Sequence, residues 1–222
     1  MHMRTLTFFP LLILTTSIGA ALPATAGPYG TKNVASVSAR SADKITKADA
    51  LRAAMRDLWT DHVVWTRVYI IAAVGNGADK QAATERLLEN QEDIGDAIAG
   101  YYGRAAGDKL TDLLKDHILI AADVVTAAKA NKAADLANAK ARWQSNADDI
   151  AKFLADANPH WPQEALEDMM DKHLSTTTDE VVARLQGDWD ADIKAYDVVY
   201  DHILMMSDTL SDGIIAQYPE RF

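Results

Sequence analysis

Four histidines stand in apolar stretches of the chain, and they are the residues best suited to carry chemistry. Two apolar residues precede each of His62, His117 and His173 by four and three positions, and valines and methionines flank His202. Apolar residues at this spacing line one face of a helix, so the four imidazoles are predicted to face a core. A buried imidazole needs a partner, which a hydrogen-bonding side chain or a metal ion would supply.

The positions of the turns predict that these histidines share one layer. In antiparallel helices joined by short turns, residues equidistant from a turn lie at the same height, because each residue rises about 1.5 Å. In one set of residues, the midpoint between each member and the next falls at a predicted turn. The set contains one residue from each predicted helix: His62, Asp93, His117, Asp149, His173 and His202.

Two functions remain open for this layer. The first is binding of a divalent metal ion, or of a small ligand, by the six residues. The chain has no cysteine, so the ligands would be nitrogen and oxygen, which suit zinc, copper, nickel or iron. Asp93 and Asp149 would be ligands, or acceptors that orient a ligating histidine. The alternative is a structural or protein-interaction bundle without metal, in which hydrogen bonds satisfy the histidines.

Signatures of catalysis are missing from the sequence. No glutamate stands three residues before any of the four histidines, so the E-x-x-H pattern of di-iron bundles is absent, as is H-E-x-x-H. Serine-nucleophile and phosphate-loop motifs are also absent. A hydrolytic metalloenzyme would further need an open coordination position and a general base. The sequence therefore favours a binding protein over an enzyme.

The elements that must position the histidines are all predicted to be helices. Apolar residues recur at helical spacing and no alternating strand pattern competes, which predicts an all-α, antiparallel up-down bundle. Thr46 and Asp49 form a capping-box start, and Asn76-Gly77 is typical of a helix end. The predicted helices cover residues 47–75, 79–102, 106–130, 133–157, 162–186 and 189–217.

An internal repeat supports this arrangement. A shift of 56 residues aligns Arg86 with Arg142, Asn90 with Asn146, and His117 with His173, among other pairs. Repeated helical hairpins explain the matches. Each hairpin alone would expose an apolar stripe, so stacking into one bundle is expected.

Three strings resemble an uncharacterised bacterial family of helical proteins. They are LWTDHVVWTR at 58–67, NQEDIG at 90–95 and DHILMM at 201–206, and the resemblance runs from about residue 52 to the C-terminus. Members of that family sometimes carry the names glycosyltransferase or acetylglutamate kinase. Neither name suits this sequence, which lacks the alternating strands and helices and the glycine-rich phosphate loop of such enzymes. The resemblance thus implies a helical fold and no particular activity.

The N-terminus is typical of an export signal. Arg4, the apolar residues 5–18 and Ala24-Thr25-Ala26 follow the signal-peptide pattern, so we predict a signal at 1–26, a flexible leader at 27–46 and the bundle at 47–222. The protein would then work outside the cytoplasm, as a periplasmic or secreted protein. The sequence predicts no membrane span in the mature protein. A net charge of −10 argues against nucleic acid, and no protein partner is indicated.

Overall fold

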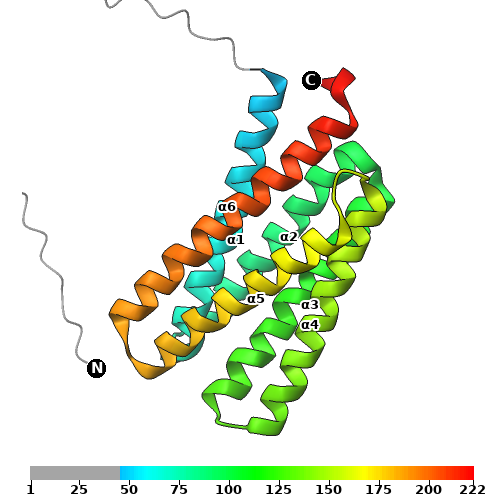
Figure 1. Cartoon of the computed structure of the whole chain (residues 1–222). Coiled ribbons are helices and arrows are strands. Elements are labelled where there is room, and N and C mark those ends of the chain that lie inside the picture. Colours follow the sequence, from blue (N-terminus) through cyan, green and yellow to red (C-terminus); the bar gives the residue numbers. More distant parts are fainter. Residues whose placement is uncertain (1–45) are drawn as a thin grey trace, which may run out of the picture. The chain divides into compact units, whose positions relative to one another are not determined.

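Six long helices make up most of residues 46–222, the part of the chain that the computed structural model describes (Figure 1). No strand occurs within these residues, so the all-α prediction is confirmed. The predicted signal segment and all but the last residue of the predicted leader lie outside the described residues. The elements are α1 (Lys47–Gly75), α2 (Lys80–Tyr102), α3 (Arg104–Lys129), α4 (Ala133–Ala157), α5 (Gln163–Gln186), α6 (Trp189–Gln217) and a short 3₁₀ helix, η1 (Pro219–Arg221).

The helix ends follow from local sequence. The Thr46 hydroxyl accepts a hydrogen bond from the Asp49 backbone N–H at 3.0 Å, and the Asp49 carboxylate accepts one from the Thr46 N–H at 3.3 Å. This capping box satisfies backbone donors that the first turn would otherwise leave unpaired. Asn76, Asn131 and Gly187 have φ values of 56°, 53° and 72°. Asparagine and glycine adopt this left-handed conformation most readily, which explains why the helices end there.

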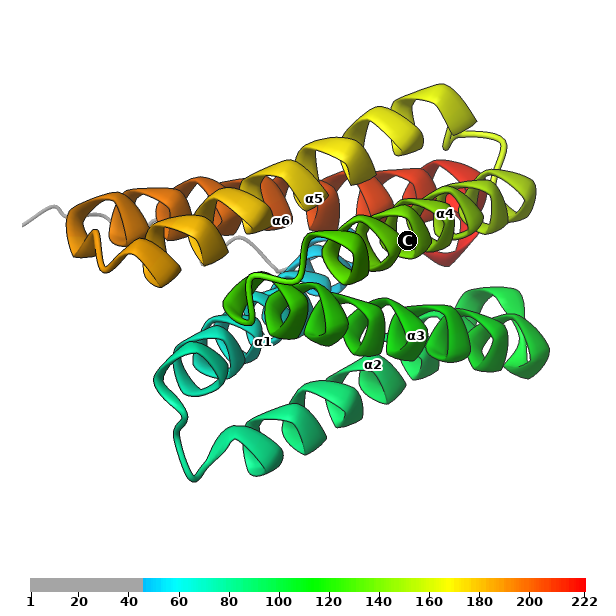
Figure 2. The same ribbon diagram turned by 90° about the horizontal axis from the view of Figure 1, so that it is seen from below.

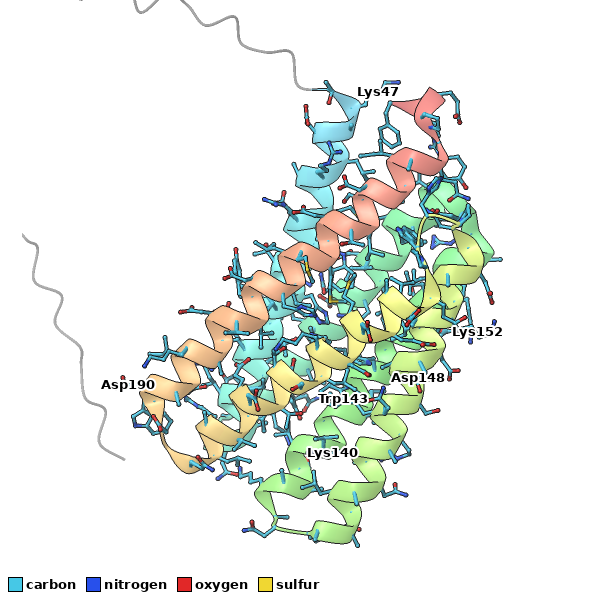
Figure 3. The ribbon with its side chains drawn as sticks, viewed as in Figure 1. Lys47, Lys140, Trp143, Asp148, Lys152 and Asp190 are labelled. Carbon is cyan, nitrogen blue, oxygen red and sulfur yellow. The ribbon has the colours of Figure 1, made fainter. Side chains whose placement is uncertain are left out.

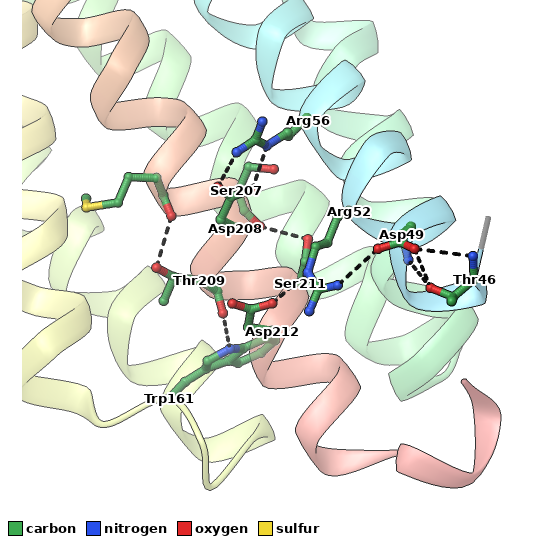
Figure 4. Close-up of polar contacts among 11 residues, drawn as sticks. Thr46, Asp49, Arg52, Arg56, Trp161, Ser207, Asp208, Thr209, Ser211 and Asp212 are labelled. Carbon is green, nitrogen blue, oxygen red and sulfur yellow. Dashed lines mark hydrogen bonds and ion pairs between the residues drawn. The ribbon is translucent and has the colours of Figure 1, made fainter. Parts of the chain in front are cut away.

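Each helix packs antiparallel to the next, and α6 returns alongside α1 to close the bundle (Figures 1 and 2). Figure 4 shows the polar contacts on this seam: Arg52 pairs with Asp212 at 2.9 Å, and Arg56 pairs with Asp208 at 2.7 Å. Exposed ion pairs of this kind contribute about 0–1 kcal/mol each. Apolar burial therefore provides most of the stabilisation of the α1–α6 contact.

The core contains two apolar clusters, and His117 lies where they meet along α3. The larger cluster includes Leu114 of α3, and the smaller one includes Ile118 of the same helix. His117 lies between these two residues in the sequence, and it is buried. No helix within residues 46–222 is long and apolar enough to cross a membrane.

Two glycines allow α2 and α3 to approach closely. A Cβ atom added to Gly107 would lie 2.5 Å from the Gly95 carbonyl oxygen and 2.6 Å from the Ala99 Cβ. The carbonyl is backbone, so a clash here cannot be relieved by rotating a side chain. Only glycine at position 107 permits this packing.

We expect Gly107→Ala to destabilise the protein by about 1–3 kcal/mol, the usual cost of overpacking a core. Urea unfolding at pH 7 measures the change. Gly100→Ala is the matched control, because a Cβ at this exposed helical position meets no atom within 4 Å. The control should stabilise the protein by about 0.5–1 kcal/mol, as alanine does in a helix interior. Equal effects of the two substitutions would contradict the close packing.

Candidate functional site

The structure brings the four predicted histidines together in the core. His62 and His117 are 3% exposed, His173 is 5% exposed and His202 is 9% exposed. His173 lies at the centre: its ring centroid is 6.1 Å from that of His62, 5.9 Å from that of His117 and 6.3 Å from that of His202. Helices α1, α3, α5 and α6 each contribute one of these histidines, and we call the four the histidine cluster.

Both ring nitrogens of His117 are engaged. The Trp143 indole N–H donates to His117 Nε2 at 3.1 Å, so Nε2 holds a lone pair and Nδ1 carries the proton. The Nδ1–H donates to Asn146 Oδ1 at 2.7 Å, and Asn146 Nδ2 donates to the Leu113 carbonyl at 3.0 Å. Trp143, labelled in Figure 3, thus holds this imidazole in place from α4. His117 is fully hydrogen-bonded and has no nitrogen left for a ligand.

His202 has the opposite tautomer and one nitrogen to spare. Its Nε2 lies 2.9 Å from the Met169 carbonyl oxygen. A carbonyl only accepts hydrogen bonds, so Nε2 carries the proton and Nδ1 holds a lone pair. Metal-binding histidines commonly donate their second N–H to a backbone carbonyl in this way, which fixes the ring orientation.

His62 is only partly engaged. Its Nδ1 lies 3.3 Å from Gln91 Nε2, and the same amide nitrogen lies 2.8 Å from the Leu87 carbonyl oxygen. Gln91 is fully buried, and its Oε1 atom has no hydrogen-bond partner. His62 Nε2 makes no hydrogen bond within residues 46–222. While Gln91 donates to Nδ1, Nε2 carries the proton; transfer of that proton to Nδ1, with the Gln91 amide turned so that its unpartnered Oε1 accepts it, would free Nε2 for a ligand.

His173 is the least satisfied member of the cluster. Neither ring nitrogen makes a hydrogen bond to the described part of the chain, and Nδ1 is buried without a partner. Most buried polar groups in proteins are hydrogen-bonded, and one left unpaired costs about 1–3 kcal/mol. The central imidazole therefore lacks the partner that its burial demands.

Burial keeps the histidine cluster uncharged near neutral pH. Desolvation lowers the pKa of His62 and of His117 to about 4, and the nearby His117 lowers that of His62 further. The pKa of His173 lies well below its usual value because of burial and its three histidine neighbours. Burial also lowers the pKa of His202. Neutral imidazoles with free lone pairs are the form that binds metal ions.

The placement expected for Asp93 and Asp149 is wrong. Both carboxylates are exposed, so they do not join the histidine cluster. Asn90 and Asn146, three residues earlier in each helix, face the core instead, and each donates to a backbone carbonyl at 3.0 Å. The turn arithmetic gives the height of a residue along the bundle but not the side of the helix on which it lies.

Unpaired polar atoms concentrate around the histidine cluster. Within residues 46–222, seven buried side-chain polar atoms have no hydrogen-bond partner. Five of the seven lie at or near the cluster. His173 Nδ1 belongs to it, and Thr66 Oγ1 and Thr177 Oγ1 lie about one helical turn from His62 and His173. Trp59 Nε1 and Gln91 Oε1 belong to residues that contact His62. His62, His117 and His173 also line an apolar cavity of about 30 Å³, larger than the roughly 10–15 Å³ that one water needs.

The imidazoles do not yet form a finished coordination shell. No three histidine, aspartate or glutamate side chains of residues 46–222 converge closely enough to hold a metal as they stand. Two imidazoles that share a metal at 2.0–2.1 Å have ring centroids about 5–6 Å apart. The separations of 6.1 Å and 6.3 Å from His173 to His62 and His202 are near this range. Closing a three-histidine shell would need the rings to rotate and His62 and His202 to approach each other as well as His173.

Sequence reasoning missed Gln91 and Trp143, which hold His62 and His117. Trp143 stands three residues before Asn146, so the two share a helix face, and this spacing was the available signal.

Comparison with known proteins found no matching protein-family model, no matching curated sequence and no matching solved structure. A functional conclusion for this chain therefore depends on its own residues.

Proposed function

We propose that this protein binds one divalent transition-metal ion through His62, His173 and His202, and that it does so outside the cytoplasm. One observation carries the proposal: His173 is buried at the centre of three other histidines, and neither of its ring nitrogens makes a hydrogen bond within residues 46–222. A metal ion would provide the missing partner. The predicted signal segment supports the location.

The remaining nitrogens suit this ligand set. His62 Nε2 and His202 Nδ1 make no hydrogen bond within residues 46–222, and the two histidines flank His173 from α1 and α6; His62 would bind in the tautomer that carries its proton on Nδ1. Three imidazoles with a water in the fourth position are a known tetrahedral arrangement for zinc, and imidazole also suits copper(II). His117 would act as a positioning residue, because Asn146 and Trp143 occupy its nitrogens. Asp93 and Asp149 have no part in the proposed site.

The test compares thermal unfolding with and without equimolar zinc or copper(II), after removal of bound metal by a chelator. An ion that binds only the folded state raises the unfolding midpoint by mass action. The purified protein, prepared without a histidine tag, should also contain about one metal ion per chain by elemental analysis. His173→Leu should remove the metal response, and His160→Leu, which alters an exposed histidine, should retain it.

Loss of the fold does not confound this experiment. Leucine at position 173 replaces an imidazole that has no partner, so the metal-free variant should be at least as stable as the metal-free parent. Purified protein without metal, and an unfolding midpoint indifferent to zinc, copper, nickel and iron, would contradict the proposal. The bundle would then be a structural or protein-interaction module whose histidines are packed core residues.

A further inference from the structure

A second cavity lies near the histidine cluster. It shares no lining residue with the cavity that His62, His117 and His173 line. Its volume is about 70 Å³, and helices α1 to α5 all contribute to its walls. The walls are mostly apolar and include Tyr69, Ile70, Leu87, Val124 and Val181. Proteins pack their interiors densely, so an apolar void of this size is a candidate ligand site.

The cavity opens toward the surface between α4 and α5. Leu136 and Lys140 of α4, and Thr178 and Val182 of α5, lie at this side of the cavity. In Figure 1 the tip of the α3–α4 hairpin diverges from α5 at this end of the bundle. A surface groove of about 480 Å³ continues outward and shares Ala128, Leu136 and Val182 with the cavity. Cavity and groove therefore adjoin, and the groove lining also includes the polar residues Lys129, Asn131 and Gln186. We call the cavity and the adjoining groove together the channel.

The size of the inner cavity favours a linear occupant. A buried apolar cavity of about 150 Å³ is known to hold benzene. The inner cavity has about half that volume, so a ring does not fit but the end of an alkyl chain does. The groove outside would cover the rest of the chain, where Val182 is already 42% exposed. An extended aliphatic tail thus matches the channel.

Two lysines line this channel, and Lys129 is engaged, because its Nζ donates to the Ala73 carbonyl and to Asn76 Oδ1. Lys140 is exposed there and forms no ion pair within residues 46–222 (Figure 3). A carboxylate at the end of an aliphatic tail would pair with Lys140 while the tail occupies the channel.

We propose that this channel binds an aliphatic monocarboxylate of medium chain length, with the tail inside and the carboxylate beside Lys140. None of the proposed metal ligands lines this cavity, although Trp143 both lines it and donates to His117. Thr66 and Thr177, whose hydroxyl oxygens are buried without partners, also line the cavity. Their presence makes the inner end less apolar than a packed core, which is consistent with a space that is not permanently filled by protein.

Titration of the chelator-treated protein with octanoate tests the proposal, with calorimetry and tryptophan fluorescence as readouts. Trp143 lines the cavity, so its emission should change as the tail enters. Ala128→Leu fills the passage between cavity and groove and should abolish binding. Val182→Gln, at the exposed groove wall, should weaken binding and serves as the second variant if Ala128→Leu does not fold.

The charge is tested separately. Lys140→Gln should weaken octanoate binding by up to about fivefold, the size expected of an exposed ion pair, and Lys140→Arg should retain it. Lys152→Gln alters an exposed lysine of the same helix (Figure 3) and should leave binding unchanged. 1-Octanol should bind more weakly than octanoate. The absence of saturable octanoate binding, unchanged binding in both Ala128→Leu and Val182→Gln, or equal binding of octanol and octanoate would overturn the proposal.

Discussion

Acidification from pH 7 to pH 4 is expected to unfold the helical bundle. Burial holds the pKa of His62 and of His117 at about 4, whereas a histidine in the unfolded chain titrates near 6.5. Between these values the unfolded chain binds protons that the folded chain does not, so stability falls as the pH drops. Each histidine contributes about 3 kcal/mol that is present above pH 6.5 and lost by pH 4.

Together the two histidines lower the free energy of unfolding by about 6 kcal/mol on acidification, which is comparable to the whole stability of a typical domain. His173, whose pKa lies well below its usual value because of burial and its histidine neighbours, adds to the loss. Glu180 acts in the opposite direction, because burial raises its pKa and protonation relieves a buried charge. We expect the histidines to dominate, since three of them titrate in the same sense.

Denaturant unfolding of the chelator-treated protein, followed by circular dichroism at pH 7, 6, 5 and 4, measures this effect. The slope of the unfolding free energy against pH gives the number of protons taken up on unfolding. His62→Leu should reduce that number by about one between pH 6 and pH 4, because the variant lacks the imidazole that titrates differently in the two states. An unchanged slope in His62→Leu would show that this imidazole is not buried and neutral in the folded protein.

Much of the fold could be predicted because local chemistry specifies it. Thr46, Asn76 and Gly187 mark helix ends through hydrogen bonding and backbone conformation, and both effects can be identified from adjacent residues. The grouping of the histidines followed from helix rise and turn position. The side of the helix on which Asp93 and Asp149 lie was harder to predict. A shift of three residues along a helix of 3.6 residues per turn moves a side chain to another part of the helix surface.

A buried charge network could not be predicted from the sequence. Arg67 of α1 pairs with Glu180 of α5 at 2.9 Å and with Asp192 of α6 at 2.8 Å. Arg184 also pairs with Asp192, at 3.0 Å. The partners of Arg67 are 113 and 125 residues away along the chain. Isolated charged residues normally indicate a solvated surface, so only the three-dimensional packing reveals this network.

Arg67→Met should be the most destabilising single substitution of a charged residue in this bundle. Glu180 and Asp192 have side chains that are 1% exposed, and the substitution removes the only partner of Glu180 within residues 46–222. Breaking a buried ion pair from one side costs about 3–5 kcal/mol, because a charge is left buried and uncompensated. Guanidinium unfolding at pH 7 measures the loss. Arg142→Met breaks an exposed pair with Asp123 and should cost no more than about 1 kcal/mol.

The pH dependence of this loss identifies its cause. Burial already raises the pKa of Glu180, and Arg67 opposes that rise, so removal of Arg67 raises the pKa further. A carboxylate whose pKa is raised by folding destabilises the folded state least at a pH below its pKa in the unfolded chain. It destabilises the folded state most at a pH above its pKa in the folded protein. The difference in stability between Arg67→Met and the parent should therefore shrink from pH 7 to pH 5, even though both proteins lose stability through their histidines. A difference that is constant with pH would mean that lost packing of the arginine stem, rather than the uncompensated Glu180 charge, causes the destabilisation.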